Sequence, residues 1–185
     1  MAKILIVYGS EEGQTAKITD HMVEFFRSRN HEVDTVYGKN VSDELRIDDY
    51  DGAIIGASIH RGRHAKYMVD LAKNHRNELN RELTAFFTVC LTAKSCKAED
   101  QAIVEEYVEN WIQDTEWRPD QIAVFAGAAL YTQYGLAKKF IVKRMSKHKG
   151  IETDTSQDYE YTDWESVDDF AETFLIAVVG DSVLA

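Results

Sequence analysis

Short runs of apolar and β-branched residues alternate along the chain with longer stretches in which apolar residues recur every three or four positions. The short runs predict buried strands, and the longer stretches predict amphipathic helices. We expect strands at Lys3–Tyr8, Glu32–Tyr37, Asp51–Ala57, Ala85–Leu91 and Ile122–Ala128. Strands that alternate with helices are typical of βαβ units, so the pattern predicts a parallel sheet.

The helical stretches have an apolar stripe with polar residues opposite it. The first spans Thr15–Arg29, another contains residues 103–112, and the last runs from about Trp164 to Val178. Their apolar positions are, in chain order, Ile18, Met22, Phe25, Phe26, Ile103, Val104, Tyr107, Val108, Trp111, Ile112, Val167, Phe170, Ala171, Phe174 and Leu175. Five strands, each followed by a helix, predict one doubly wound, flavodoxin-like α/β domain over residues 1–185, with a five-stranded parallel sheet in the order 2-1-3-4-5.

The stretch from residue 130 to residue 163 does not fit this five-unit pattern. It separates the fifth strand from the last helix, where a connection of roughly 2–6 residues is usual. A connection this long usually has a function or a structure of its own. We therefore expect a long insertion after strand five, at about 130–163.

Composition narrows the class of protein further. The chain has 185 residues, of which 44% are hydrophobic and 29% are charged, which is typical of a globular domain. No apolar run approaches the roughly 18–20 residues that cross a bilayer, so we expect a cytoplasmic protein. The formal net charge of −11 argues against nucleic-acid binding. Cys90 and Cys96 have a spacing that fits neither a zinc site nor a C-x-x-C redox pair, and no metal site is predicted.

The first loop has the residue types that bind a phosphate. It connects the first strand to the first helix and consists of Ser10, Glu11, Glu12, Gly13, Gln14 and Thr15. In doubly wound sheets, the unpaired N–H groups and the dipole of a helix N-terminus hold an anion at this place. Ser10 and Thr15 add hydroxyl donors, and Gly13 lets the backbone approach the phosphate closely. Because the loop has no basic residue, we expect amides and hydroxyls to bind the phosphate.

This loop resembles the FMN phosphate loop of flavodoxins, which usually follows the pattern T/S-x-T/S-G-x-T. It departs from that pattern at Glu12, where most flavodoxins have a hydroxyl residue. A carboxylate that pointed at a phosphate dianion would repel it. We therefore expect the Glu12 side chain to face solvent and only its amide to take part. The resemblance implies that the cofactor is FMN.

Two further loops complete the cofactor site that this resemblance implies. Ala57, Ser58, Ile59 and His60 end the third strand and begin its loop, and Leu91, Thr92, Ala93 and Lys94 follow the fourth strand. In the flavodoxin fold these loops flank the isoalloxazine ring, where backbone donors tune the reduction potential. His60 and Arg61 either present a planar or cationic group to the ring or to an anionic substrate, or are solvated loop residues. Neither loop has the aromatic residue that stacks on the flavin in carrier flavodoxins, so we expect a flavin that is open on one face.

Six motifs, spread over nearly the whole chain, extend the resemblance beyond a generic flavodoxin, and the last of them is the most discriminating because ordinary flavodoxins lack it. They are Gly13-Gln14-Thr15, Ile55-Gly56-Ala57-Ser58-Ile59, Trp117-Arg118-Pro119-Asp120, Ala126-Gly127-Ala128-Ala129-Leu130-Tyr131, Glu152-Thr153-Asp154-Thr155 and Tyr161-Thr162-Asp163-Trp164-Glu165. With these motifs and its long insertion, the chain resembles the menaquinone-dependent protoporphyrinogen IX dehydrogenases, flavodoxin-like enzymes of bacterial haem synthesis. The resemblance implies an oxidoreductase whose FMN accepts electrons from protoporphyrinogen IX in three two-electron steps and passes them to menaquinone or another quinone.

Two other functions remain open at this point. One is a flavodoxin-type electron-transfer protein without a substrate of its own, and the other is an NAD(P)H:quinone reductase. The missing stacking aromatic residues count against the carrier. The sequence has no Ser/His/Asp arrangement that would support hydrolytic catalysis, and it identifies no catalytic side chain.

A basic segment lies within the predicted insertion. Residues 138–149 contain six bases and no acid, namely Lys138, Lys139, Lys143, Arg144, Lys147 and Lys149. The apolar residues between them suit an interface with lipid or with a large flat ligand. Three interpretations stay open: peripheral contact with an anionic membrane where menaquinone is found, attraction of the propionates of the porphyrinogen, and a solvated basic patch.

Overall fold

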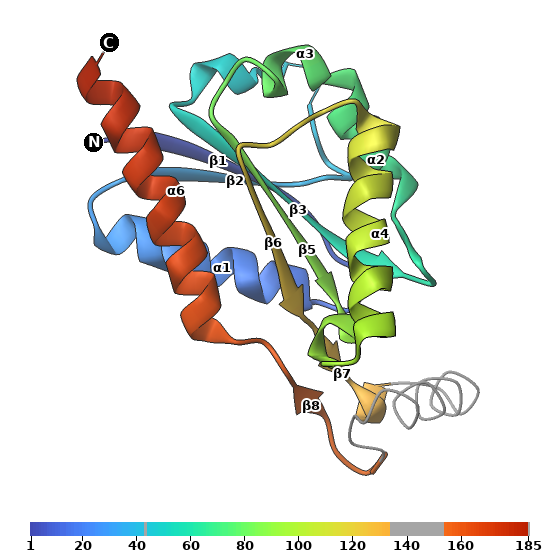
Figure 1. Ribbon diagram of the computed structural model, residues 1–185. Coiled ribbons are helices and arrows are strands. Elements are labelled where there is room, and N and C mark those ends of the chain that lie inside the picture. Colours follow the sequence, from blue (N-terminus) through green and yellow to red (C-terminus); the bar gives the residue numbers. More distant parts are fainter. Residues whose placement is uncertain (43, 134–153, 185) are drawn as a thin grey trace.

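A five-stranded parallel sheet forms the centre of the computed structural model, which describes residues 1–42, 44–133 and 154–184 (Figure 1). The strands are β1 (Lys3–Gly9), β2 (Glu32–Tyr37), β3 (Gly52–His60), β5 (Thr84–Cys90) and β6 (Gln121–Ala126), and they lie in the order β2-β1-β3-β5-β6. This is the predicted order 2-1-3-4-5, because β4 is a short strand outside the parallel path. The fold class is therefore confirmed.

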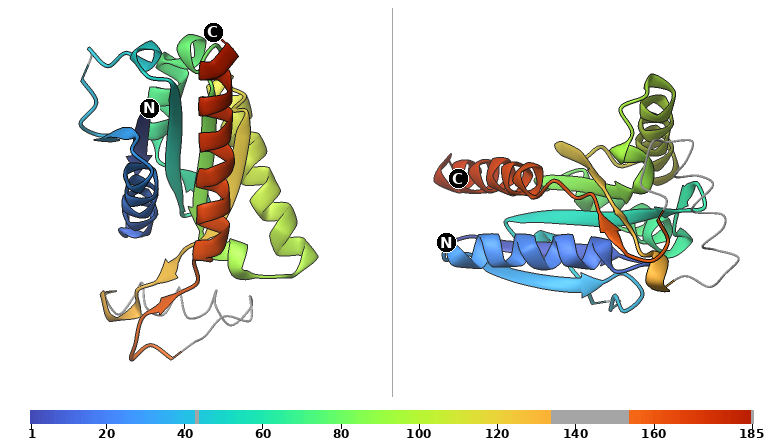
Figure 2. Two further views of the ribbon diagram at one scale, coloured as in Figure 1. Left: turned by 90° about the vertical axis from the view of Figure 1, so that its left-hand side faces the viewer. Right: turned by 90° about the horizontal axis from the view of Figure 1, so that it is seen from below.

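Helices cover both faces of the sheet (Figures 1 and 2). On one face α1 (Gln14–Ser28) lies beside α6 (Trp164–Leu184), and on the other α2 (Lys66–Asn74) lies beside α4 (Ala98–Thr115). The short α3 (Arg76–Leu79) follows α2. The apolar stripes of these helices and the apolar residues of the strands form two buried clusters, one on each face. Burying each large apolar side chain contributes roughly 1.5–3 kcal/mol to stability.

Three details of the helices differ from the prediction. Strand β2 is followed by the 3-10 helix Ile47–Asp49 rather than by an α-helix, and the buried Ile47 fills part of the space that a helix would cover. The last helix continues past Val178 to Leu184, since its sequence contains no proline to stop it. In α4, Ile103 is 38% exposed, so it does not belong to the buried stripe.

The third strand is longer than predicted. It continues to His60 and turns back into β4 (Arg63–His64), so that Ser58, Ile59 and His60 belong to a strand and not to a loop. The two residues between the strands, Arg61 and Gly62, both have positive φ, 53° and 78°. This is the backbone of a type I′ turn, which suits the twist of a two-residue hairpin. The prediction missed it because arginine, unlike asparagine or glycine, is unusual at the first position of that turn.

The predicted insertion begins and ends in a small antiparallel sheet. Strand β7 (Ala128–Ala129) pairs with β8 (Tyr159–Glu160), and the 3-10 helix Tyr131–Gln133 follows β7. This small sheet projects from the carboxyl edge of the large sheet (Figure 2). The basic segment 138–149 lies outside the described residues. Among the helices that the structure describes, none is both long enough and apolar enough to cross a membrane.

Candidate functional site

The predicted site residues come from three segments that meet at the carboxyl edge of the sheet. In the register of the sheet, Gly9 lies next to Ala57, and β3 pairs with β5 up to position 58. Residues 10–15, 57–60 and 91–94 therefore lie beside one another at this edge. The carboxyl edge of an open parallel sheet is where ligands of such folds bind.

The first loop forms a cradle at the start of α1. Gly13 has a φ of 92° and is the residue at which the helix begins. Its N–H donates to Ser10 Oγ at 2.9 Å, and its carbonyl accepts the N–H of Lys17 at 3.0 Å. The amides of the first turn precede this bond and have no intrahelical acceptor. A phosphate placed here would accept those N–H groups and would also meet the positive end of the helix dipole.

The hydroxyl of Thr15 tests whether this cradle fits a phosphate. Thr15 is only 1% exposed, and its Oγ1 has no hydrogen-bond partner among the described residues. A buried hydroxyl without a partner costs roughly 1–3 kcal/mol unless a ligand satisfies it. Thr19, one turn further along α1, has a buried unpartnered hydroxyl as well. Thr15 lies in the first helical turn, where the free amides are, and it therefore fits a phosphate.

The sequence predicted that the Glu12 side chain faces solvent, but in the structure this side chain is only partly exposed. Its side chain is 28% exposed, and its Oε1 lies 3.9 Å from Nδ1 of His60 on β3. The carboxylate is thus directed along the sheet edge toward the neighbouring strand.

Contacts with the end of the insertion hold the cradle in place, and these contacts were not predicted. Gln14 Nε2 donates to Thr162 Oγ1 at 2.8 Å, and that hydroxyl donates to the carbonyl of Ala126 at 2.8 Å. Lys17 forms an ion pair with Glu160 in the next turn of α1. The start of α1 is thereby tied to both β6 and β8. Asp163 completes this segment by capping α6, and its hydrogen bonds to Ser166 hold the pKa of its carboxyl below the usual value.

Aromatic residues reach the same edge from the end of the predicted insertion, which the sequence analysis did not assign to the cofactor site. Residues 91–94 form a 3-10 helix, in which Thr92 is buried and Lys94 is exposed. The Nζ of Lys94 lies 5.6 Å from the ring centre of Tyr161, which stacks on Tyr159 at 6.3 Å and 6°. The two loops themselves lack an aromatic residue, but the segment after the insertion brings two aromatic rings close to the second of them. The alternating tyrosines before the last helix were the available signal.

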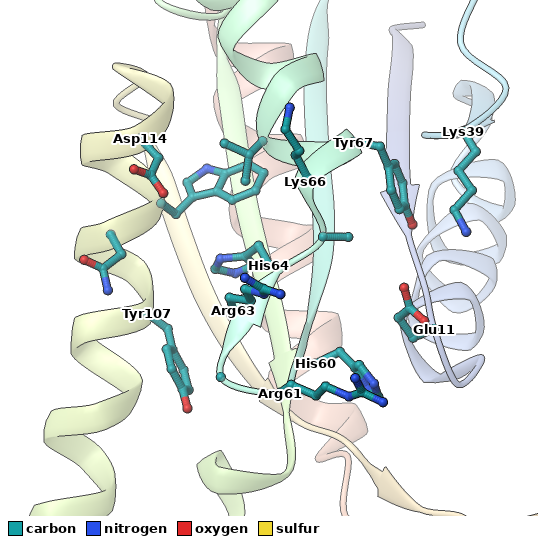
Figure 3. Close-up of a pocket in the computed structure, with 15 residues that line it drawn as sticks. Glu11, Lys39, His60, Arg61, Arg63, His64, Lys66, Tyr67, Tyr107 and Asp114 are labelled. Atoms are coloured by element: carbon teal, nitrogen blue, oxygen red, sulfur yellow. The ribbon is translucent and has the colours of Figure 1, made fainter.

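A cavity of about 720 Å³ opens behind the β3–β4 hairpin. It lies between α2 and α4 and extends to the first loop, with His60 and Arg61 in the middle of its mouth (Figure 3). Of the residues that line it, His60 and Arg61 were named from the sequence as possible contacts of an anionic ligand, and Glu11 as a backbone ligand. Its other lining residues are Lys39, Gly62, Arg63, His64, Ala65, Lys66, Tyr67, Val69, Tyr107, Asn110, Trp111 and Asp114.

Burial fixes the protonation of two groups in this cavity. His64 is buried between Phe86 and Trp111 and hydrogen-bonds through Nε2 to Thr88 Oγ1 at 3.0 Å. Burial lowers the pKa of His64 to about 4, so the ring is neutral near pH 7. Burial likewise raises the pKa of Tyr107, which stays a neutral phenol. The positive charge of the cavity therefore comes from its lysines and arginines.

A family model matches this arrangement over most of the chain. The model of the flavodoxin domain matches residues 5–156. The chain belongs to the flavodoxin family. The match begins in β1 of this chain and includes the cradle, the β3–β4 hairpin and the segment after β5. It ends before β8 and α6.

Individual relatives carry the name of the enzyme family that the sequence motifs resemble. It is 32% identical over 169 residues to the protoporphyrinogen IX dehydrogenase [quinone] of Escherichia coli (strain K12), which covers 91% of this chain and 92% of that protein. A Leishmania major protein of the same name is 29% identical over 172 residues, 93% of this chain and 74% of that one. Among solved structures, the rubredoxin oxygen:oxidoreductase of Desulfovibrio gigas has a TM-score of 0.58 with 15% identity, over 96% of this chain and 36% of that one. That structure supports the fold alone.

Proposed function

We propose that this protein is an FMN-dependent oxidoreductase that oxidises protoporphyrinogen IX and reduces a quinone. The observation that carries the proposal is the 32% identity over 91% of the chain to a protein named protoporphyrinogen IX dehydrogenase [quinone]. The cradle at the start of α1 supports it independently, because an enzyme of this kind needs a place for the phosphate of its flavin. The first observation is a sequence identity over most of the chain, and the second is the structure of a single loop.

FMN fits the residues of the cradle. We assign its phosphate to the hydroxyls of Ser10 and Thr15 and to free amides of residues 11–15, with the buried Thr15 hydroxyl as the decisive group. The amide of Gly13 already donates to Ser10, so Gly13 contributes through its positive φ and not through its N–H. The two glutamates contribute their amides, namely those of Glu11 and Glu12. Because no base is required, the phosphate is held by fixed dipoles.

The flavin ring is assigned to the neighbouring part of the sheet edge. Ala57, Ser58, Ile59 and His60 flank it from β3, and Leu91, Thr92, Ala93 and Lys94 flank it from the 3-10 helix after β5. Bound FMN supplies two-electron redox chemistry between the porphyrinogen and the quinone. The residues of the chain position the two reactants and supply hydrogen-bond donors at the edge of the ring. Tyr161, close to Lys94, offers an aromatic surface there.

The overall reaction balances with a quinone as the oxidant. Each oxidation removes two electrons and two protons from the porphyrinogen and converts one quinone to the quinol. Three such oxidations give the fully conjugated porphyrin and three quinols. No other co-reactant is needed.

Anaerobic flavin reduction tests the proposal. The FMN-loaded protein is mixed with protoporphyrinogen IX, and the visible absorbance of the flavin is followed; a menaquinone analogue is then added. We expect protoporphyrinogen IX to bleach the flavin absorbance and the menaquinone analogue to restore it. Porphyrin fluorescence should increase at the same time. NADH and NADPH serve as alternative donors in parallel samples. A flavin that stays oxidised with the porphyrinogen but is reduced by NAD(P)H would identify a different reductase, and one that no small donor reduces would indicate a carrier.

The basic segment 138–149 adds a proposal about location, since its quinone partner is lipid-soluble. Six bases without an acid, in a chain of net charge −11, suit peripheral contact with an anionic membrane surface. Co-sedimentation with vesicles that contain phosphatidylglycerol tests this. We expect wild-type protein to bind and the double variant Lys139→Glu/Lys143→Glu to remain in the supernatant while retaining FMN. Equal binding of both proteins would refute the membrane contact.

A further inference from the structure

The cavity behind the β3–β4 hairpin concentrates positive charge on a strongly acidic protein. Its lining contains the bases Lys39, Arg61, Arg63 and Lys66 but only the acids Glu11 and Asp114. Lys66 is paired with Asp70 on its own helix. Arg61 and Arg63 are exposed, and within the described part of the chain neither guanidinium forms an ion pair. By contrast, Arg46 elsewhere on the surface is paired with Asp48 at 2.8 Å.

The backbone at Arg61 is a second, independent observation. Its φ of 53° lies in the left-handed region, which costs a non-glycine residue on the order of 1–2 kcal/mol. At the first position of a type I′ turn, asparagine or glycine would avoid much of this cost. A locally unfavourable residue that is kept at the mouth of a cavity indicates a functional side chain. In Figure 3 the Arg61 side chain extends from the turn alongside His60, on the side of the cavity mouth that faces the first loop.

The inner wall of the cavity is aromatic. Trp111, only 1% exposed, forms part of the floor, and its indole N–H has no hydrogen-bond partner among the described residues. Tyr107 from α4 reaches the tip of the hairpin, where its hydroxyl lies 3.9 Å from the position that a Cβ on Gly62 would take. A volume of about 720 Å³ falls within the roughly 300–1,000 Å³ range of pockets that take cofactor-sized ligands. The cavity thus combines aromatic lining residues with a cationic mouth.

We propose that this cavity binds the carboxylate-bearing edge of a planar tetrapyrrole, with the guanidinium groups of Arg61 and Arg63 as the partners of its carboxylates. Guanidinium groups bind carboxylates in a bidentate manner, and the aromatic wall receives the apolar body of the ring system. The inference rests on the proposed function for its choice of ligand. It adds the site, which lies next to the flavin edge through His60, and the residues that recognise the substrate.

Binding of protoporphyrin IX, the stable oxidised form, to the FMN-loaded protein tests the inference. Its affinity is measured by quenching of protein fluorescence for wild type and for the double variant Arg61→Asn/Arg63→Gln. Arg61→Asn gives the turn the Asn-Gly dipeptide that it prefers, so the variant should fold at least as well as wild type. We expect the Kd for protoporphyrin IX to rise roughly tenfold to hundredfold, with the Kd for FMN unchanged.

Two controls isolate the charge. Arg81→Gln removes one positive charge, half of the change in the double variant, from an exposed residue at the opposite edge of the sheet, just before β5, and should leave the Kd for protoporphyrin IX unchanged. The dimethyl ester of protoporphyrin IX has no carboxylate and should bind wild type and the double variant equally. Unchanged binding of protoporphyrin IX by the double variant, or equal binding of acid and ester by wild type, would overturn the inference.

The same proteins separate this inference from the proposed function. If protoporphyrinogen bleaches the flavin in wild type but the double variant has unchanged binding and KM, the function stands and the carboxylate site is wrong. If protoporphyrinogen never bleaches the flavin while the double variant loses protoporphyrin IX binding, the site stands and the proposed reaction is wrong.

Discussion

The cradle at the start of α1 and the cavity behind the β3–β4 hairpin both suit anions, but they do so by different physical means. The cradle contains two glutamates and no base, and the donors that it offers are backbone amides at the start of the helix and the hydroxyls of Ser10 and Thr15. The cavity offers instead the exposed side chains of Arg61 and Arg63. Fixed dipoles suit a cofactor that stays bound, whereas exposed guanidinium groups suit a ligand that must bind and leave.

The two regions also differ in how they are anchored. Gln14 and Lys17 tie the cradle to the segment after the insertion. The hairpin is held by the antiparallel pairing of β3 with β4 and by the buried His64, which packs on aromatic residues of the α2–α4 face. Changes in the cradle are therefore expected to act on FMN, and changes in the hairpin on the substrate and on acid stability.

A pair of glycine substitutions should produce the largest difference between the two regions. Gly13 and Gly62 both have positive φ, 92° and 78°, and neither has an atom closer than 3.9 Å to the position of an added Cβ. Gly13→Val and Gly62→Val should therefore suffer similar backbone strain, about 1–2 kcal/mol or more. We expect only Gly13→Val to weaken FMN binding, by roughly a hundredfold or more, because only Gly13 shapes the loop to which we assign the phosphate. Fluorescence titration with FMN measures both, and an equal loss in the two variants would show that strain alone is responsible.

Acid should destabilise the protein through the hairpin. His64 has a folded pKa of about 4, below its unfolded value of 6.5, so the folded state binds its proton more weakly. Its contribution to stability is complete above about pH 6.5 and is lost as the pH falls toward 4, by about 3 kcal/mol in total. Urea unfolding at several pH values in this window measures the loss. The variant His64→Gln should show a flatter pH dependence there, and an unchanged slope would contradict the assignment to His64.

The hydroxyl of Thr15 should separate binding from stability. Thr15→Val removes a buried hydroxyl that has no partner among the described residues, so the FMN-free protein should be at least as stable as wild type. The Kd for FMN should rise about tenfold, because the phosphate loses one hydroxyl donor. Thr19→Val makes the same change one turn away, outside the free amides, and should leave the Kd for FMN unaltered. If both variants bind FMN like wild type, Thr15 is not a phosphate ligand.

The cradle was predictable from sequence because its chemistry is local. Ser10, Gly13 and Thr15 lie within one short segment whose place between strand and helix follows from the apolar pattern. The strands were predictable from their local pattern, and their order followed from the rule for doubly wound sheets of five strand–helix units. The hairpin was missed because a type I′ turn usually has Asn, Asp or Gly at its first central position, where this chain has Arg61. Turn prediction from sequence depends on such residue preferences.

The cavity could not be predicted, because its walls come from elements far apart along the chain. Tyr107 and Trp111 belong to the apolar stripe of a helix, and the pattern assigned them only to the core. Whether such residues also line a cavity depends on how α2 and α4 pack, which the spacing of apolar residues does not specify. The contact between Gln14 and Thr162 spans 148 positions and has no local signal either.

That contact gives the smallest expected effect and the finest test of how the cradle is anchored. Thr162 Oγ1 accepts from Gln14 Nε2 and donates to the Ala126 carbonyl, so Thr162→Val leaves both of those groups without their partner. We expect a loss of about 1 kcal/mol of stability and a severalfold rise in the Kd for FMN, with a coupling energy of about 0.5–1.5 kcal/mol to Gln14→Ala in a double-mutant cycle. Urea unfolding of the two single variants and the double variant measures the coupling. Additive effects would mean that the segment after the insertion does not anchor the cradle through this hydrogen bond, and the difference in anchoring between cradle and hairpin would then rest on the exposed Lys17–Glu160 ion pair, which contributes little.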